Sequence, residues 1–253
     1  MPPQLEPLPV FAFWDGSDHS LLIQFKTEWQ AQFPQFRIYG NDDVAPLIER
    51  HLPGYLDLYN AIRIPAARAD VARLILLFEL GGLYIDCHCG VRDVDGIRRL
   101  LAQLEQVELI FFDRMRDLPP GQTQKHTLIN AMLVSRPRSD LILAICRQAF
   151  TNLAQHRESE RKAGLAPYSI WALCGPGLIS AMVLLPNSYS LDVRPEFQPR
   201  IMTIPEEDAP IARNRHRTYS RKGQHWSERQ KVERLFEEGP RAPEVVAVCS
   251  SAR

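Results

Sequence analysis

The chain has 253 residues, and its 45% hydrophobic content is sufficient for the core of one large α/β domain. Thirty Lys and Arg residues balance thirty Asp and Glu residues, so no net charge draws the protein to nucleic acid or to an anionic membrane. An anionic ligand would therefore have to be bound by a local group of charged side chains.

The N-terminal part of the chain predicts a strand, a helix and a second strand. Val10–Trp14 is β-prone and runs into a glycine turn. A helix capped by Asp18 or Ser20 follows, with apolar residues at helical spacing: Leu22, Phe25, Trp29 and Phe33. Phe36–Tyr39 is expected to be a short strand and Asn41–Asp43 a polar turn. This alternation favours a largely parallel sheet covered by helices.

A helix, a glycine pair and a buried strand follow one another in the middle of the chain. Ala66–Leu80 carries apolar residues at helical spacing, which predicts a helix. Gly81–Gly82 ends it, because glycine takes the left-handed conformation at little cost. Leu83–Ile85 then predicts a buried strand, with Asp86 and His88 just beyond its carboxyl end. Open α/β sheets bind their ligands at that edge.

The remaining elements have weaker patterns. Helices are expected over residues 97–104, 141–153 and 177–185, strands over 109–112, 131–134 and 201–204, and a polar loop over 114–126. The tail, from about residue 205 to 253, has few apolar residues and carries Arg213, Arg215, Arg217, Arg221, Lys222 and Trp226. No repeat or linker is evident, so we expect a single domain over residues 1–253.

The N-terminus and the cysteines indicate a compartment. Residues 1–9 lack the basic start and the apolar run of a signal peptide, and no apolar run is long enough to cross a bilayer. We therefore expect a cytoplasmic protein without a transmembrane segment. An odd number of cysteines favours free thiols. Cys87-His88-Cys89 is compatible with zinc, but a structural zinc site usually needs a second ligand pair, which the sequence lacks.

Asp86 and His88 have a spacing that suits a divalent metal ion. Two ligands one residue apart, on an extended segment after a strand, can converge on one ion while a diphosphate and water fill its other positions. Such an ion would stabilise the negative charge of a leaving diphosphate. The alternative is that Asp86 caps the next turn and His88 is an ordinary, partly buried imidazole.

Three charged residues, Arg68, Asp70 and Arg73, lie on the otherwise apolar helix that precedes this strand. Polar groups beside a buried face need partners, and Asp70 and Arg73, three residues apart, share a face. They form either an internal ion pair or a hydroxyl-binding carboxylate beside a phosphate-binding guanidinium. The spacing alone leaves both possibilities open.

The stretch Arg68–Asp86 resembles the signature of the DXD-containing sugar transferases. With the preceding alanine it reads A-R-A-D-V-A-R-L-I-L-L-F-E-L-G-G-L-Y-I-D. That family includes the fungal initiating mannosyltransferases, bacterial capsular polysaccharide synthesis proteins and, more remotely, the clostridial glucosylating toxins. Its pattern is an Asp and an Arg on a helix, two glycines, an aromatic-aliphatic pair and then Asp-x-Asp.

Shorter matches flank this signature over roughly residues 10–228. Phe13–Gly16 is similar to the family's first-strand turn, and Trp29 lies where its next helix carries a Trp. Asn130–Met132 resembles an Asn-bearing central strand, Gly175–Gly177 a glycine-proline turn, and His225–Trp226 a C-terminal pair that closes over the diphosphate. From the residues alone, the two N-terminal tryptophans fit a core equally well, Gly-Pro-Gly fits a plain turn, and the tail arginines fit a solvated surface.

The resemblance implies a GT-A type α/β fold, with a Rossmann-like, mostly parallel central sheet flanked by helices, and a tail that closes over the donor site. It places these residues around the donor: Trp14 on the base, Asp70 and Arg73 on the sugar and its phosphate, Tyr84 and Asp86 on the ribose and metal, and Arg68, Asn130, His225 and Trp226 around them. Asp70, Arg73 and Asp86 would carry catalysis.

His88 replaces the second Asp of the motif, the direct metal ligand. Polypeptide N-acetylgalactosaminyltransferases use Asp-x-His, so the replacement fits a metal site, and it equally fits a lapsed catalyst.

These inferences predict a metal-dependent glycosyltransferase that moves a sugar, with retention of configuration, from a UDP- or GDP-linked donor to a hydroxyl-bearing acceptor. The acceptor would be a glycan, as in polysaccharide biosynthesis, or a lipid-linked molecule, a small molecule or a peptide. The site at Asp86 and His88 should favour Mn²⁺ over Mg²⁺, because imidazole suits later first-row ions. The alternative is a catalytically silent module that binds a nucleotide-sugar or a carbohydrate.

Overall fold

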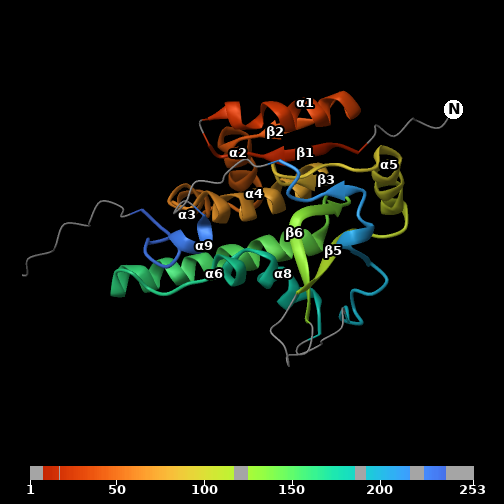
Figure 1. Cartoon of the computed structure of the whole chain (residues 1–253). Helices are drawn as coiled ribbons and strands as arrows, with labels where there is room; N and C mark the ends of the chain where they lie inside the picture. The colour runs from red at the N-terminus through yellow and green to blue at the C-terminus, as the bar shows by residue number, and fades with distance from the viewer. Residues whose placement is uncertain (1–7, 17, 117–124, 186–191, 217–224, 238–253) are drawn as a thin grey trace, which may run out of the picture.

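A six-stranded sheet in the order β2-β1-β3-β6-β5-β7 runs through the centre of the protein (Figure 1). The computed structural model describes residues 8–16, 18–116, 125–185, 192–216 and 225–237. The strands are β1 (Val10–Phe13), β2 (Arg37–Tyr39), β3 (Gly82–Ile85), β5 (Leu109–Arg116), β6 (Lys125–Ser135) and β7 (Ile201–Pro205), and a separate pair is formed by β4 (Gly90–Val91) and β8 (Ile211–Ala212).

The helices follow the strands in alternation through the first half of the chain. They are α1 (Ile23–Gln32), α2 (Asn41–His51), α3 (Leu56–Asn60), α4 (Pro65–Leu80), α5 (Val94–Ala102), α6 (Asp140–Ala163), α7 (Ile170–Leu173), α8 (Pro176–Val183) and α9 (Trp226–Arg229). Short 3₁₀ helices are η1 (His19–Leu22), η2 (Gln103–Glu105) and η3 (Glu206–Asp208). In the described part of the chain, no helix combines the length and apolar character needed to cross a membrane.

The sheet is mostly parallel, as expected. β1 pairs in parallel with β2 and β3, and β5 pairs in parallel with β7. Strand β6 is the exception, because it is antiparallel to both of its neighbours, β3 and β5. The parallel strands β1 and β3 therefore end at one edge of the sheet, where their carboxyl ends present Trp14 and Asp86.

Alternating side chains of the strands divide the core into two layers. Phe11 and Phe13 of β1 belong to a cluster shared with helices α2, α4, α6 and α8, whereas Val10 and Ala12 face a cluster shared with α1 and α5. Figure 1 shows the same arrangement, with α1 on one side of β1 and α4 and α6 on the other. Both faces of the sheet are thus covered, as a mostly parallel sheet requires.

The glycine pair between α4 and β3 makes a sharp reversal possible. Gly81 ends α4 with φ +63° and Gly82 opens β3 with φ +87°, both in the region that favours glycine. A Cβ at Gly82 would lie 2.1 Å from the carbonyl oxygen of Pro9, which accepts the backbone N–H of Leu83. The two glycines therefore let the chain pass directly from α4 into β3 and lie close to Pro9, the residue before β1.

Two of the expected loops are wrong. Asn41–Asp43 is the first turn of α2, not a polar turn, because Asp43 accepts the backbone N–H of Gly40 at 2.9 Å and its acidic neighbours suit a helix N-terminus. Part of the expected loop 114–126 is β-structure, since the pairing of β5 with β6 continues as far as Arg116 and Lys125. Backbone ladders tolerate polar side chains, so polarity alone did not locate the strand ends.

Candidate functional site

A cavity of about 1310 Å³ opens at the carboxyl ends of β1 and β3. Its walls come from Phe13–Gly16 after β1, from α4, from the segment after β3, from β6, from α7 and α8, and from the C-terminal part of the chain. Eight of the predicted site residues line it: Trp14, Asp70, Arg73, Tyr84, Asp86, Asn130, His225 and Trp226. His88 lines it as well.

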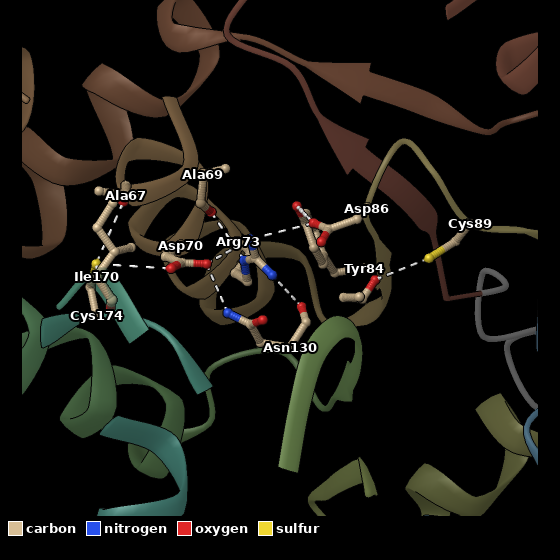
Figure 2. Close-up of polar contacts among 11 residues, drawn as sticks. Ala67, Ala69, Asp70, Arg73, Tyr84, Asp86, Cys89, Asn130, Ile170 and Cys174 are labelled. Atoms are coloured by element: carbon tan, nitrogen blue, oxygen red, sulfur yellow. Dashed lines mark hydrogen bonds and ion pairs between the residues drawn. The ribbon is translucent and has the colours of Figure 1, made fainter. Parts of the chain in front are cut away.

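Arg73 of α4 lies at the centre of this site, and only 4% of it is exposed. Its Nη2 is 2.7 Å from Asp70 Oδ1 and 3.4 Å from Asp86 Oδ1, so one guanidinium joins two carboxylates from different elements (Figure 2). Its plane lies over the ring of Tyr84, with Cζ 4.9 Å from the ring centroid. The guanidinium also donates to the backbone carbonyl of Asn130, so the side chain is held from four directions.

Asp70 is a buried carboxylate with a polar partner on each side. Besides Arg73, it accepts a hydrogen bond from Asn130 Nδ2 at 2.8 Å. Burial raises its pKa to about 7, although Arg73 and the hydrogen bond from Asn130 act in the opposite direction. A Cβ at Gly175 would lie 3.0 Å from Asp70 Oδ2, so a glycine here lets the start of α8 approach the carboxylate.

An irregularity in β6 turns Asn130 toward α4. Phe111 of β5 pairs with Leu133, but the next residue, Phe112, pairs with Ile129, so residues 130–132 have no partner on β5. The bulge brings the Asn130 amide to Asp70, and it places the carbonyl of Ala131 2.7 Å from the backbone nitrogen of Asp86. One irregular turn of strand therefore fixes both carboxylates of the site.

Among the described residues, the side-chain contacts of Asp86 converge on one carboxylate oxygen, which leaves the other for a ligand. Tyr84 Oη donates to its Oδ1 at 2.7 Å, and Arg73 approaches the same oxygen. His88 lies two residues on in the turn after β3 and lines the same cavity. Burial is the main cause that lowers the pKa of His88, with Asp86 acting against it, so the imidazole is neutral near pH 7.

These two side chains fit a divalent ion whose remaining ligands come from a substrate. The free Asp86 oxygen and a neutral imidazole are both suitable donors for Mn²⁺. Among the described residues, no group of three His, Cys, Asp or Glu side chains is placed to hold a metal. Cys87 and Cys89 are buried, free thiols whose pKa values burial raises.

Trp14 and Trp29, both weighed as base platforms, have different surroundings. Trp14 is partly buried, and its ring borders the cavity beside Gly16, where a Cβ would lie 2.8 Å from the indole nitrogen. Trp29 is fully buried in the core beside α1, and its indole N–H donates to the carbonyl of Cys89 at 2.9 Å. Trp29 is thus a core residue that braces the turn carrying His88.

Arg68 is placed differently from the other predicted site residues, since it is absent from the residues that line the cavity. Its Nη1 is 2.9 Å from Asp15 Oδ1, and it also donates to the carbonyl of Ile62. Asp15 itself lines the cavity next to Trp14 and is further bound by Asn41. Arg68 therefore holds the loop after β1 in place.

The C-terminal part of the chain supplies a further wall. His225 caps α9 and Trp226 begins it, and both line the cavity. Among the tail arginines, Arg213 lines the cavity and is ion-paired with Glu206, whereas Arg215 pairs with Glu28 at 3.2 Å. Arg217, Arg221 and Lys222, also named as basic tail residues, lie outside the described residues.

Several lining residues were not singled out from the sequence. They are Asp15, Arg114, Thr127, Trp171, Asn214, His216, Arg229 and Glu233. Asp15 directly follows Trp14, the predicted base platform, so its position after β1 could have identified it as a lining residue. The others lie on elements whose patterns are weak, and only the fold brings them to this edge of the sheet.

Residues 22–103 match a protein family described as "Glycosyltransferase sugar-binding region containing DXD motif". The matched segment contains Asp70, Arg73, Asp86 and His88. The match covers about a third of the chain and agrees with the resemblance seen in the sequence to a class of enzymes, the glycosyltransferases. A comparison with curated protein sequences gives no match.

Comparison with solved structures finds glycosyltransferases at low identity. "PaToxG Glycosyltransferase" is 12% identical, with a TM-score of 0.40 over 69% of this chain and 67% of that one. The UDP-bound glycosyltransferase domain of the YGT toxin is 11% identical, with a TM-score of 0.35 over 63% of this chain and 51% of that one, so this chain spans about half of that domain. A glycosyltransferase involved in the glycosylation of the major capsid of PBCV-1 is 9% identical, with a TM-score of 0.34 over 88% of this chain and 96% of that one.

Proposed function

We propose that this chain transfers a sugar from a UDP- or GDP-linked donor to a hydroxyl-bearing acceptor, with retention of configuration. The match of residues 22–103 to a glycosyltransferase sugar-binding region supports the proposal. The observation that carries the proposal is the network in which Arg73 joins Asp70 to Asp86 at the wall of the cavity. Charged groups fixed before the substrate arrives need no rearrangement when charge develops during the reaction.

In this proposal the donor lies along the edge of the sheet from Trp14 to Arg73. The Trp14 ring stacks on the base, and Asp70 accepts hydrogen bonds from the sugar's hydroxyl groups. Arg73 faces the phosphate attached to the sugar, while Asp70 and Asp86 hold the guanidinium in position. His225 and Trp226 cover the donor from the C-terminal side. The acceptor in this proposal is a hydroxyl-bearing glycan, lipid-linked molecule, small molecule or peptide.

Asp86 Oδ2 and a ring nitrogen of His88 would hold the divalent ion. When bound, such an ion stabilises the charge of the departing diphosphate. The protein's own contribution is to keep the Asp86 carboxylate oriented through Tyr84 and to keep His88 deprotonated by partial burial. The free, buried thiols fit a reducing, cytoplasmic setting, which we propose together with a single domain over residues 1–253.

Metal preference should depend on His88. We expect Mn²⁺ to activate donor hydrolysis well above Mg²⁺, because Mg²⁺ prefers an all-oxygen octahedron whereas Mn²⁺ accepts imidazole more readily. The His88→Asp variant restores the carboxylate of the motif, so its Mn²⁺ to Mg²⁺ activity ratio should fall. The ratio is measured at saturating metal for both proteins. Full activity in His88→Ala would remove His88 from the metal site.

Replacing Trp14 should weaken nucleotide binding. We expect Trp14→Ala to raise the dissociation constant of the nucleotide by about tenfold or more, the loss typical of one base-stacking contact. Calorimetric titration with UDP and with GDP, each with Mn²⁺, checks this. Trp14→Phe is the matched variant, because it keeps an aromatic ring at the cavity wall, so its affinity should fall less than that of Trp14→Ala. Unchanged affinity in Trp14→Ala would make Trp14 a core residue only.

Donor binding should depend on pH through Asp70. Its pKa, raised to about 7 chiefly by burial, means that the carboxylate ionises as the pH rises through neutrality. An ionised carboxylate accepts stronger hydrogen bonds from sugar hydroxyls, so donor affinity should increase over this range and level off above it. Titrations between about pH 5.5 and 8.5 test this. Asp70→Asn should flatten the profile, and an unchanged profile in that variant would assign the titration to another group.

The alternative is a catalytically silent binding module. It is favoured by one departure from the motif, in which His88 stands where the family has its second aspartate. Hydrolysis of donor separates the two proposals, since a silent module binds nucleotide-sugars without releasing the nucleotide. The assay mixes purified protein with UDP-glucose, UDP-N-acetylglucosamine or GDP-mannose and Mn²⁺, and measures released UDP or GDP. Metal-dependent release supports the transferase, and binding without release supports the module.

A further inference from the structure

Glu160 of α6 is a buried carboxylate, only 1% exposed, that lies outside the cavity lining. Its two oxygens accept successive backbone N–H groups, Leu235 N to Oε1 at 2.7 Å and Phe236 N to Oε2 at 3.2 Å. His156 Nε2 is 3.1 Å from Oε1, and Arg234 Nε is 3.6 Å from Oε2. The carboxylate is thus satisfied mainly by a segment that lies 75 residues further along the chain.

The residues that Glu160 binds are inserted into the fold. Leu235 and Phe236 are buried, with 0% and 1% of each exposed. The carbonyl of Leu235 accepts the backbone N–H of Arg63 at 2.8 Å, and Glu237 N donates to the carbonyl of Ala61 at 2.9 Å. This short antiparallel contact clamps the segment between α6 and the residues that lead into α4.

The clamped residues continue directly from those that wall the cavity. His225, Trp226, Arg229 and Glu233 line the cavity within the same segment. Between the cavity and the clamp, Gln230 Oε1 accepts the backbone N–H of Ile170 at 3.1 Å, which joins α9 to the start of α7. The position of the cavity's C-terminal wall is therefore linked to the contacts that Glu160 makes.

We infer that Glu160 is a positioning residue that holds residues 225–237 as the outer wall of the donor cavity. A buried carboxylate that loses its hydrogen-bond donors is costly, so the docked segment and Glu160 stabilise each other. When the contact between Glu160 and residues 225–237 is weakened, this segment leaves its docked position and the cavity loses its C-terminal wall. That the cavity binds a nucleotide-sugar rests on the proposed function, whereas the anchoring of the segment does not.

The test compares Glu160→Gln with Glu158→Gln, a matched control on the same helix whose carboxylate is half exposed and pairs with Arg161 and Lys162. In Glu160→Gln the side-chain NH₂ faces one of the two backbone N–H groups, so that hydrogen bond is lost and the other is no longer charge-assisted. We expect amide hydrogen exchange to rise in residues 225–237 while the central sheet keeps its protection. We also expect KM for the donor to rise about tenfold, with kcat changed less, which corresponds to one charge-assisted hydrogen bond.

Leu235→Ala is the second variant. It weakens the same contact by a change in the docked segment and leaves the sequence of α6 unchanged. It is used in place of Glu160→Gln if that variant does not fold. Raised exchange of residues 225–237 in either variant supports the anchor, and unchanged exchange overturns it, whether or not any donor is hydrolysed. Where the wild type hydrolyses a donor, an unchanged KM in a released variant would overturn the link between anchor and cavity. Absence of donor binding by the wild type would instead count against the proposed function.

Discussion

Asp86→Ala is expected to reduce metal-dependent donor turnover by about a thousandfold or more while the protein stays folded. The substitution removes a carboxylate that lines the cavity and is the partner of both Tyr84 and Arg73. Loss of a group that stabilises charge in the transition state typically costs two to three orders of magnitude, and the loss of a metal ligand adds to this. Turnover is measured by UDP or GDP release, and folding by circular dichroism and thermal denaturation.

Asp86→Asn separates charge from shape in the same position. The amide keeps the size of the side chain but is a poor metal ligand, so activity should fall nearly as far as in Asp86→Ala. Asp93→Asn is the control, since Asp93 is an exposed carboxylate outside the cavity lining. Wild-type turnover in Asp86→Asn would show that the residue has only a structural role.

Arg73→Ala is expected to abolish turnover and to destabilise the fold by about 3–5 kcal/mol, the usual cost of removing one partner of a buried ion pair. Asp70 would remain buried without its cation, retaining only the hydrogen bond from Asn130 and the weak contact of the Cys174 thiol, 4.0 Å away. The Asp86 carboxylate would also lose its second partner. Chemical denaturation measures the free energy of unfolding, and donor release measures the activity.

A double-mutant cycle identifies the origin of that loss. Adding Asp70→Asn to Arg73→Ala neutralises the orphaned carboxylate, so the double variant should be more stable than Arg73→Ala by about 1 kcal/mol or more. Activity should not return, because Arg73 is proposed to face the phosphate. The single variant Asp70→Asn completes the cycle, and single-variant destabilisations that simply add up to that of the double variant would show that Asp70 and Arg73 are not coupled. Recovered activity would remove Arg73 from the donor site.

The part of the site built on continuous sequence was predictable. The helix over α4, the glycine pair and the strand β3 follow from periodicity and from glycine's conformational freedom, and they place Arg73 and Asp86 beside each other. The family resemblance then supplied the expected roles. Sequence spacing left open whether Asp70 and Arg73 form an ion pair or a ligand site. The structure shows that they are paired and also line the cavity.

Features that depend on distant contacts could not be found in the same way. The bulge at Asn130 depends on the pairing of β6 with β5, and no local pattern encodes it. The ion-pair partner of Arg68 could not be identified from local spacing, because Asp15 lies 53 residues earlier in the chain. The role of Glu160 likewise arises from a contact with Leu235 that only the folded chain creates.

The measurement that tests the central claim most directly is release of nucleotide from UDP- and GDP-linked sugars by the purified wild-type protein, with Mn²⁺ and with a chelator. We expect at least one donor to be cleaved to free UDP or GDP in the presence of Mn²⁺, and we expect the chelator to abolish this cleavage. Asp86→Asn provides the inactive control. Binding without cleavage, or cleavage that persists with the chelator and in Asp86→Asn, would contradict a metal-dependent sugar transferase acting at this site.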